Sequence, residues 1–155
     1  VFFKALKNDG NNISKGDKLA EISGKSVSIL QAERVALNFL QRMSGIATLT
    51  NKFVRQIASF KAKLLDTRKT TPMLREFEKY AVRVGGGFNH RFGLYDMVML
   101  KENHIRAVGS ITAAVNRIKK HTTSYKIEVE VTNLRELEEA ARCGVDRIML
   151  DNMSL

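Results

Sequence analysis

Residues 127–151, IEVEVTNLRELEEAARCGVDRIMLD, decide the fold, because they hold two short apolar runs with a helical pattern between them. The runs at 127–131 and 147–151 each predict a buried strand. The segment 134–143 has the apolar spacing of a helix. Strands that are joined through a helix predict a parallel βαβ unit.

Capping residues mark the ends of the predicted helices. Asn133 can accept a hydrogen bond from the first turn of the helix at 134–143, and Gly144 can end that helix. Farther toward the N-terminus, Thr71 followed by Pro72 predicts the start of another helix, with proline in its first turn.

The alternation of strand and helix extends back to about residue 60. Apolar runs at 63–66 and 97–101 predict two further strands, and 73–84 and 111–120 predict two further helices. A closed barrel of eight such units needs roughly 250 residues, so four units make about half of one. The expected fold class is therefore α/β, with an incomplete barrel.

The N-terminal residues have a different pattern. Up to about residue 30 the chain predicts short strands around Leu19, Ile22, Val27 and Ile29, separated by turn clusters. The Gly-Lys-Ser triplet at 24–26 does not make a nucleotide-binding loop, because leucine occupies the place of the upstream glycine.

From Gln31 the apolar spacing becomes helical, and Gly45 is expected to divide this region into two helices near Ser44. The expected domains are therefore 1–44, the remainder of an N-terminal α/β domain, and 45–155, the first part of the barrel.

Composition limits the possible functions. The chain has 155 residues, of which 44% are hydrophobic, so it can bury a core. One cysteine, Cys143, excludes a disulfide framework and fits a reducing, cytoplasmic location. No apolar run reaches the roughly 18 residues of a transmembrane helix. The chain starts at Val1 without a signal-peptide pattern, and the missing initiator methionine suggests a fragment.

The charge balance indicates an anionic partner. The chain has 26 Lys and Arg residues and 16 Asp and Glu residues, which give a net charge of +10. The basic residues do not form a long run. This balance suits either a folded nucleic-acid-binding surface or a basic pocket for a small polyanion.

Charged residues at the predicted strand ends favour the pocket. In parallel α/β folds, ligands bind beyond the carboxyl ends of the strands. Those ends carry Arg68 and Lys69 as cations, Lys101 as a third, and Glu130 and Asp151 as acids. Arginine and lysine bind carboxylates and phosphates, whereas carboxylates hold Mg²⁺ or sugar hydroxyls.

A second candidate element is the glycine run 85–87, which is followed closely by His90 and Arg91. Glycines let the backbone approach a ligand or act as a hinge, although a plain flexible turn is an equal alternative. No His/Cys spacing indicates a transition-metal site. Neither Ser44 nor Cys143 has the surroundings of an acyl-transfer nucleophile.

Seven blocks, in this order, resemble the quinolinate phosphoribosyltransferases. They are 33–38 (ERVALN), 44–48 (SGIAT), 66–72 (DTRKTTP), 79–83 (KYAVR), 85–91 (GGGFNHR), 101–104 (KENH) and 150–152 (LDN). The resemblance extends from about Gly16 to Asn152.

It implies the type II phosphoribosyltransferase fold, in which an N-terminal α/β sandwich domain precedes an open α/β barrel. Glu102 departs from the pattern, since aspartate is common there. The family pattern also implies further residues at both ends, including the loops that hold the 5-phosphate.

The resemblance also implies an activity. It is the Mg²⁺-dependent transfer of phosphoribosyl from phosphoribosyl pyrophosphate to quinolinate with decarboxylation, which gives nicotinate mononucleotide in NAD biosynthesis. The enzyme would be a homodimer or a higher oligomer with shared active sites. By motif, the resemblance implies four quinolinate ligands, namely Arg68, His90, Arg91 and Lys101. It also implies that Arg34 comes from the neighbouring subunit and that Lys69 lies between the two substrates. Glu130 and Asp151 would lie near the ribose and Mg²⁺ and would bind the metal directly or indirectly. Glu128 shares a strand face with Glu130, but Glu130 is nearer the carboxyl end.

Two alternatives stay open at this point. The first is a basic nucleic-acid-binding module, which the absence of Trp and the presence of three Tyr make less favourable for base stacking. The second is a related phosphoribosyltransferase that acts on nicotinate or another small anion. Arg68→Ala would separate the second alternative from the quinolinate enzyme. It is expected to weaken binding of a 2,3-dicarboxylate much more than binding of a monocarboxylate, and equal losses would favour the alternative.

Overall fold

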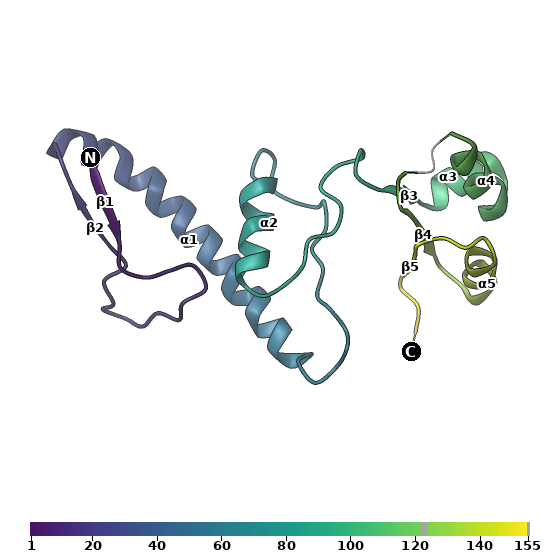
Figure 1. Ribbon diagram of the computed structural model, residues 1–155, viewed down its shortest axis with the longest axis horizontal. Coiled ribbons are helices and arrows are strands. Elements are labelled where there is room, and N and C mark those ends of the chain that lie inside the picture. Colours follow the sequence, from purple (N-terminus) through teal and green to yellow (C-terminus); the bar gives the residue numbers. More distant parts are fainter. Residues whose placement is uncertain (122–123, 155) are drawn as a thin grey trace. The chain divides into compact units, whose positions relative to one another are not determined.

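The computed structural model describes residues 1–121 and 124–154 and has the expected α/β composition. The chain folds as two compact units, Val1–His90 and Arg91–Leu155. Figure 1 shows the elements of each unit in chain order. No helix within the described residues has both the length and the apolar character required to cross a bilayer.

The first unit begins with an antiparallel hairpin. Strand β1 (Phe2–Ala5) pairs with β2 (Ala20–Ser23), with Phe2 opposite Ser23. The predicted turn clusters close the connection, since the Asn8 amide donates to Asn11 Oδ1 at 2.9 Å and the Ser14 amide to Asp17 Oδ2 at 3.1 Å. Asparagine and aspartate are frequent at such turns because their side chains bond to nearby backbone groups.

Helix α1 (Ser26–Gln56) corrects two sequence predictions. It includes Val27 and Ile29, which were expected in a strand, and it continues through Gly45 without a break. An interior glycine costs only about 1 kcal/mol relative to alanine, which packing of the rest of the helix can offset. The predicted domain boundary at 44/45 thus lies inside one helix and stays a prediction.

Helix α2 (Arg75–Val84) packs on α1. Phe39 and Phe77 meet with ring centroids 5.0 Å apart, and Arg42 donates to Glu78 Oε1 at 2.5 Å. Partial burial alone would raise the pKa of Glu78, but hydrogen bonds from Arg42 and Thr71 outweigh it and hold that pKa below its ordinary value.

The predicted start of α2 at Pro72 is wrong. Pro72 and Met73 form a turn, Met73 has a φ of +64°, and the helix begins only at Arg75 after Leu74 as N-cap. The left-handed backbone at Met73 interrupts any helix that starts at Pro72, because α-helical residues need a negative φ.

The glycine run after α2 is a packing feature. A Cβ on Gly85 would lie 2.5 Å from the Ala47 carbonyl oxygen, and one on Gly87 would lie 3.0 Å from Thr50 Cγ2, both on α1. Gly86 has a φ of +90°, which favours glycine. The sequence left open a close approach to a ligand, a hinge or a flexible turn for this run, and the structure shows close approach to α1 at Gly85 and Gly87.

Replacing Gly85 with alanine is therefore expected to lower the free energy of unfolding by about 2 kcal/mol, because the new methyl group would collide with backbone that cannot move aside. Urea unfolding measures this effect. Gly45→Ala is the matched control, since nothing lies within 4 Å of its added Cβ, and it is expected to keep or raise stability. Equal effects at both glycines would contradict the packing explanation.

The strand predicted at 63–66 is reduced to a single bridge. Leu65 pairs in parallel with Phe88, through hydrogen bonds from the Asp66 amide to the Phe88 carbonyl at 3.1 Å and from the Phe88 amide to the Leu64 carbonyl at 2.9 Å. The apolar run is short and is followed at once by polar residues. The pairing among the described residues therefore does not extend beyond this one bridge.

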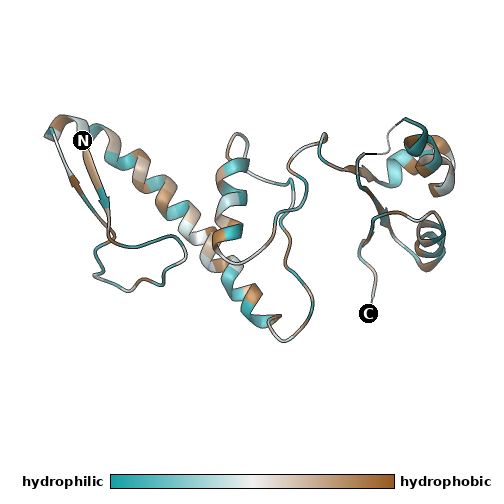
Figure 2. Cartoon of the chain, in the orientation of Figure 1, coloured by the Kyte–Doolittle hydropathy of each residue, from teal (hydrophilic) through white to brown (hydrophobic). Residues whose placement is uncertain are grey.

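The second unit is a parallel sheet with helices on one face. Strands β3 (Val98–Leu100), β4 (Ile127–Val131) and β5 (Arg147–Leu150) lie in the order β3-β4-β5. Helices α4 (Ile111–His121) and α5 (Leu134–Arg142) connect them. Figure 2 shows hydrophobic residues along the strands and both hydrophobic and hydrophilic residues on α5. The core of this unit consists of Leu100, Ile111, Ala114, Val115, Ile127, Val129, Val131 and Ala140.

The predicted caps of α5 are confirmed. Asn133 Oδ1 accepts a hydrogen bond from the Glu136 amide at 3.0 Å, and Gly144 has a φ of +60° just beyond the helix. A further short helix, α3 (Glu102–Val108), was not predicted. His104 Nδ1 accepts from the Lys101 amide at 3.1 Å, and Gly109, with a φ of +100°, ends α3.

Two glutamates hold helix starts in this unit and make its stability depend on pH. Glu136 accepts from the Thr132 amide and Glu139 from the Thr112 amide, both at 2.8 Å, and these hydrogen bonds are the main cause that lowers the pKa of each carboxyl. A depressed folded-state pKa contributes stability that is present above the unfolded value and lost as pH falls through the folded value.

The free energy of unfolding is therefore expected to decrease as pH falls below about 4.3, the ordinary glutamate pKa. Glu139→Gln is expected to lower stability at pH 7 by about 1 kcal/mol and to flatten this decrease. Urea unfolding at several pH values measures both. An unchanged pH slope in the variant would contradict the assignment.

Candidate active site

Three of the predicted site residues lie at the carboxyl ends of three adjacent strands in the second unit. Lys101 comes directly after β3, Glu130 lies near the end of β4, and Asp151 comes directly after β5. Val129 and Val131 pack in the core, so alternation directs Glu130 to the opposite face of the sheet. The register pairs Leu100 with Val129, which brings Lys101 level with Glu130.

Lys101 and Glu130 form an ion pair across neighbouring strands. The Lys101 side chain is 44% exposed and that of Glu130 is 17% exposed, so the pair borders solvent. The Asp151 amide donates to the Val131 carbonyl at 2.8 Å, which fixes the chain where β5 ends. Part of the predicted meeting of basic and acidic strand ends is thus present within this unit.

Glu130 and Asp151 line a pocket of about 100 Å³, together with residues of α3 and of the start of α5. Its other lining residues are Glu102, Ile105, Arg106, Thr132 and Glu136. The pocket is rich in carboxylates, but within residues 1–121 and 124–154 no three His, Cys, Asp or Glu side chains gather closely enough to hold a metal ion.

Glu128 differs from Glu130 in its surroundings. It is fully buried and pairs with Arg147 Nη1 at 3.3 Å, whereas Glu130 pairs with Lys101 and borders the pocket. This placement favours Glu130 over Glu128 as the acid that contacts a ligand.

Arg91 opens the second unit and contacts its first strand region. Its Nη1 donates to the Met97 carbonyl at 3.2 Å. The loop between them is closed by Asp96, which accepts from the Phe92 amide at 2.6 Å and the Gly93 amide at 3.0 Å. Burial alone would raise the pKa of Asp96, but these hydrogen bonds outweigh it and lower that pKa.

In the first unit, Arg68 and Lys69 lie on the loop that follows Leu65. Arg75 of α2 holds this loop, because its Nε donates to Thr70 Oγ1 at 3.1 Å and its Nη2 to the Arg68 carbonyl at 3.2 Å. No group among the described residues accepts a hydrogen bond from the buried Nε of Arg68. A buried guanidinium N–H without an acceptor is costly, and a bound carboxylate would relieve that cost.

Lys69 lies at a separate small pocket in this unit. The pocket has a volume of about 160 Å³ and includes Asp66, Thr67, Thr70 and Lys79 in its lining. The side chain of Lys69 is exposed, and its amide donates to Thr67 Oγ1 at 3.1 Å. Its ammonium group can therefore meet a ligand without first losing a buried partner.

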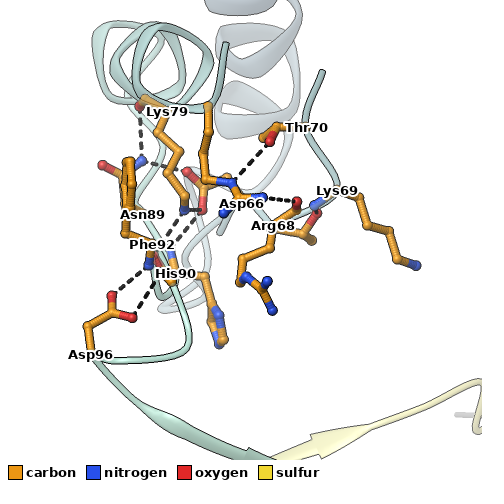
Figure 3. Close-up of polar contacts among 12 residues, drawn as sticks. Asp66, Arg68, Lys69, Thr70, Lys79, Asn89, His90, Phe92 and Asp96 are labelled. Atoms are coloured by element: carbon orange, nitrogen blue, oxygen red, sulfur yellow. Dashed lines mark hydrogen bonds and ion pairs between the residues drawn. The ribbon is translucent and has the colours of Figure 1, made fainter. Parts of the chain in front are cut away.

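His90 depends on a buried ion pair that the sequence analysis did not identify. Lys79 Nζ lies 2.5 Å from Asp66 Oδ1, and the two side chains are 4% and 8% exposed. The His90 amide donates to Asp66 Oδ1 at 2.8 Å, and the His90 carbonyl accepts from Lys79 Nζ at 3.0 Å. Figure 3 shows Lys79 and His90 beside Asp66, with the bonds that join them.

Arg34 lies on α1 with an exposed side chain, and it has no role in the contacts described above. Sequence reasoning also missed Asp66, Lys79 and Arg75 as supporting residues, although Asp66 and Lys79 lie in blocks that carry the family resemblance. The position of Asp66, directly after the apolar run that contains Leu65, was the available signal for its place near the site.

Comparison with known proteins identifies the family. The model of the quinolinate phosphoribosyl transferase N-terminal domain matches residues 1–44, and that of its C-terminal domain matches residues 46–155. A probable nicotinate-nucleotide pyrophosphorylase (carboxylating) of Bacillus subtilis is 50% identical over 147 residues, which cover 94% of this chain and 51% of the relative. Quinolinate phosphoribosyltransferase (decarboxylating) 1b of Nicotiana tabacum is 47% identical over 156 residues, 94% of this chain and 44% of the relative.

Solved structures agree with these relatives. NadC from Streptococcus pyogenes superposes with a TM-score of 0.94 at 53% identity, covering 99% of this chain and 55% of that one. The nicotinate-nucleotide pyrophosphorylase from Francisella tularensis gives a TM-score of 0.94 at 50% identity, with 99% and 55% coverage. The chain thus spans about half the length of the relatives that it matches. Since both domain models match, this chain belongs to the quinolinate phosphoribosyltransferase family.

Proposed function

We propose that the protein transfers phosphoribosyl from phosphoribosyl pyrophosphate to quinolinate and removes one carboxylate, which gives nicotinate mononucleotide, pyrophosphate and CO₂. The observation that carries this proposal is the match of both family domains in their order along one chain. The placement of Lys101, Glu130 and Asp151 at adjacent strand ends supports it.

Quinolinate binding is assigned to the cations. Quinolinate is a dianion, and removing two carboxylates from water requires fixed positive charges and hydrogen bonds in compensation. Arg68, with its buried Nε, is the first of these, and His90, Arg91 and Lys101 are the others. Lys101 would exchange part of its contact with Glu130 for a substrate carboxylate.

Phosphoribosyl transfer is assigned to Lys69, Glu130 and Asp151. The ring nitrogen of quinolinate forms a bond to the anomeric carbon while the bond from that carbon to the pyrophosphate oxygen breaks. Positive charge develops on the ribose, and the two carboxylates, which line one pocket, would stabilise it. Lys69 stabilises the negative charge that develops on the departing oxygen.

Decarboxylation follows on the ribosylated ring. The carboxylate next to the ring nitrogen leaves as CO₂, its bonding electron pair passes to the positively charged ring, and a proton from solvent takes its place on carbon. The protein contributes orientation of the remaining carboxylate and electrostatic stabilisation, so no covalent nucleophile is needed.

Mg²⁺ fits this site only with help from substrate. Glu130 and Asp151 would hold it, directly or through water, and it would neutralise charge on the pyrophosphate. Mg²⁺ is commonly bound by one or two carboxylates together with substrate phosphates and water. This mode of binding agrees with a pocket in which two carboxylates are accessible to solvent and no cluster of three protein ligands is present among the described residues.

The assembly is proposed to be a homodimer, or a higher oligomer built from it, in which Arg34 of one subunit reaches the substrate of the other. An exposed arginine on α1 is available for such a contact. We place the enzyme in the cytoplasm, with no membrane or nucleic-acid partner.

A product assay tests the proposed function. The protein, incubated with Mg²⁺, phosphoribosyl pyrophosphate and quinolinate, is expected to release nicotinate mononucleotide and CO₂ in equal amounts, and chromatography with CO₂ trapping measures them. Nicotinate in place of quinolinate is expected to give little product. Turnover of nicotinate at a similar rate would favour a related phosphoribosyltransferase, and tight salt-dependent DNA binding without turnover would favour a nucleic-acid-binding module.

A further inference from the structure

The buried pair of Asp66 and Lys79 links the two loops of the first unit that carry proposed quinolinate ligands. Asp66 lies two residues before Arg68, on one loop. Both backbone groups of His90, on the other loop, bond to the pair, the amide to Asp66 Oδ1 at 2.8 Å and the carbonyl to Lys79 Nζ at 3.0 Å.

Asn89 completes the connection. Its Nδ2 donates to Asp66 Oδ2 at 2.5 Å and to the Lys79 carbonyl at 2.9 Å. The carboxylate of Asp66 thus accepts hydrogen bonds on both oxygens, from a lysine, an amide side chain and a backbone amide. Figure 3 shows Asn89 and His90 on one side of Asp66, with Arg68 on the chain that follows it.

Stability alone is a weak reason for such a pair. The side chains of Asp66 and Lys79 are 8% and 4% exposed, so both charges have lost most of their hydration. An apolar pair of similar volume is often as stable as a buried ion pair, because desolvation offsets the attraction between the charges. What an apolar pair lacks is directed bonding to the N–H and C=O of a neighbouring loop.

We propose that Asp66, with Lys79, is a positioning residue for quinolinate. It fixes the backbone of His90 and the start of the Arg68 loop, so that both side chains are held for the dicarboxylate before substrate arrives. This inference rests on the proposed function, since it assigns a supporting role at the same site. Both carboxylate oxygens of Asp66 already accept hydrogen bonds from protein groups, so its proposed role acts through His90 and Arg68.

The test compares steady-state kinetics and urea unfolding in the complete protein. Asp66→Leu combined with Lys79→Met removes both charges together and leaves no buried ion without a partner. We expect a lower urea midpoint, because the His90 amide and carbonyl lose their partners. We also expect a rise in KM for quinolinate of roughly 30-fold or more, and a KM for phosphoribosyl pyrophosphate within about twofold of the parent value.

Asp66→Asn is the second variant, in case the double variant does not fold. It keeps the shape and one acceptor oxygen, so it is expected to raise KM for quinolinate by a smaller factor. Glu139→Gln is the matched control, because Glu139 also accepts a backbone hydrogen bond but serves the start of α4. It is expected to lower the urea midpoint without changing KM for quinolinate.

The outcomes separate the two proposals. A parent protein that does not turn over quinolinate would overturn the proposed function. If the parent is active and folded Asp66 variants keep its KM for quinolinate, the positioning role is overturned. It is also overturned if KM for both substrates rises together and in proportion to lost stability, as a purely structural role predicts.

Discussion

Replacing Arg68 with alanine is expected to lower kcat/KM for quinolinate by roughly 10²- to 10³-fold, with most of the change in KM. The guanidinium can bind a carboxylate through two parallel hydrogen bonds, which is the strongest pairing available for such a group. Its Nε is already buried without an acceptor among the described residues, so the cost of desolvation has been met before substrate binds. Steady-state kinetics at saturating phosphoribosyl pyrophosphate measures the loss.

Two controls sharpen this expectation. Arg117→Ala removes an exposed arginine of α4 and keeps the change in net charge the same, so it is expected to have no effect on kcat/KM. Binding of quinolinate should weaken much more than binding of a pyridine monocarboxylate. Equal losses of affinity for both ligands would mean that Arg68 does not bind the second carboxylate. They would favour a phosphoribosyltransferase that acts on another small anion.

Replacing Glu130 with glutamine is expected to lower kcat rather than to raise KM. We expect kcat to fall by roughly 10²-fold or more, with KM for quinolinate changed by less than about threefold, because the lost charge is needed mainly where positive charge develops on the ribose. The Lys101 partner is 44% exposed, so loss of their ion pair should change stability by only about 1 kcal/mol or less.

Glu138→Gln is the matched control for Glu130, since Glu138 is an exposed acid on α5. It should leave both kinetic parameters unchanged. A Glu130→Gln enzyme with parental kcat would remove this residue from the transfer step. It would then be necessary to test Glu128, the buried acid on the same face of β4.

Regular alternation made the second unit the more predictable part of the fold. The period-two pattern of β4 and the caps Asn133 and Gly144 gave the strand and helix with nearly correct ends. Helix α3 was missed because its short segment follows β3 without a separating turn. Its sequence signals were His104, three residues after Lys101, and Gly109 at the end.

The first unit was harder to predict because tertiary packing overrode local signals. Gly45 suggested a break in a helix that is in fact continuous, and Pro72 suggested a helix start that the left-handed Met73 prevents. The glycines at 85 and 87 were interpreted as flexible or as ligand-facing, whereas they are required by contact with α1. None of these contacts has a signature in the local sequence.

The candidate site was predictable in its residue types but not in its support. Charged residues at strand ends indicated Lys101, Glu130 and Asp151, and these lie at the carboxyl ends of adjacent strands as expected. The substrate roles of all the site residues stay predictions. The burial of Lys79 had no sequence signal, since a lysine on an amphipathic helix is usually exposed.

The uninterrupted course of α1 has a practical consequence for dissecting the protein. The two family domain models meet between residues 44 and 46, near the middle of a helix that extends from Ser26 to Gln56. Separating the domains by cutting the gene there would create new helix termini on both products, each with backbone groups that lose their partners. The first product would also lack α2, which packs on this helix. Truncation after residue 90 respects the compact unit and is the more suitable starting point for studying its N-terminal part.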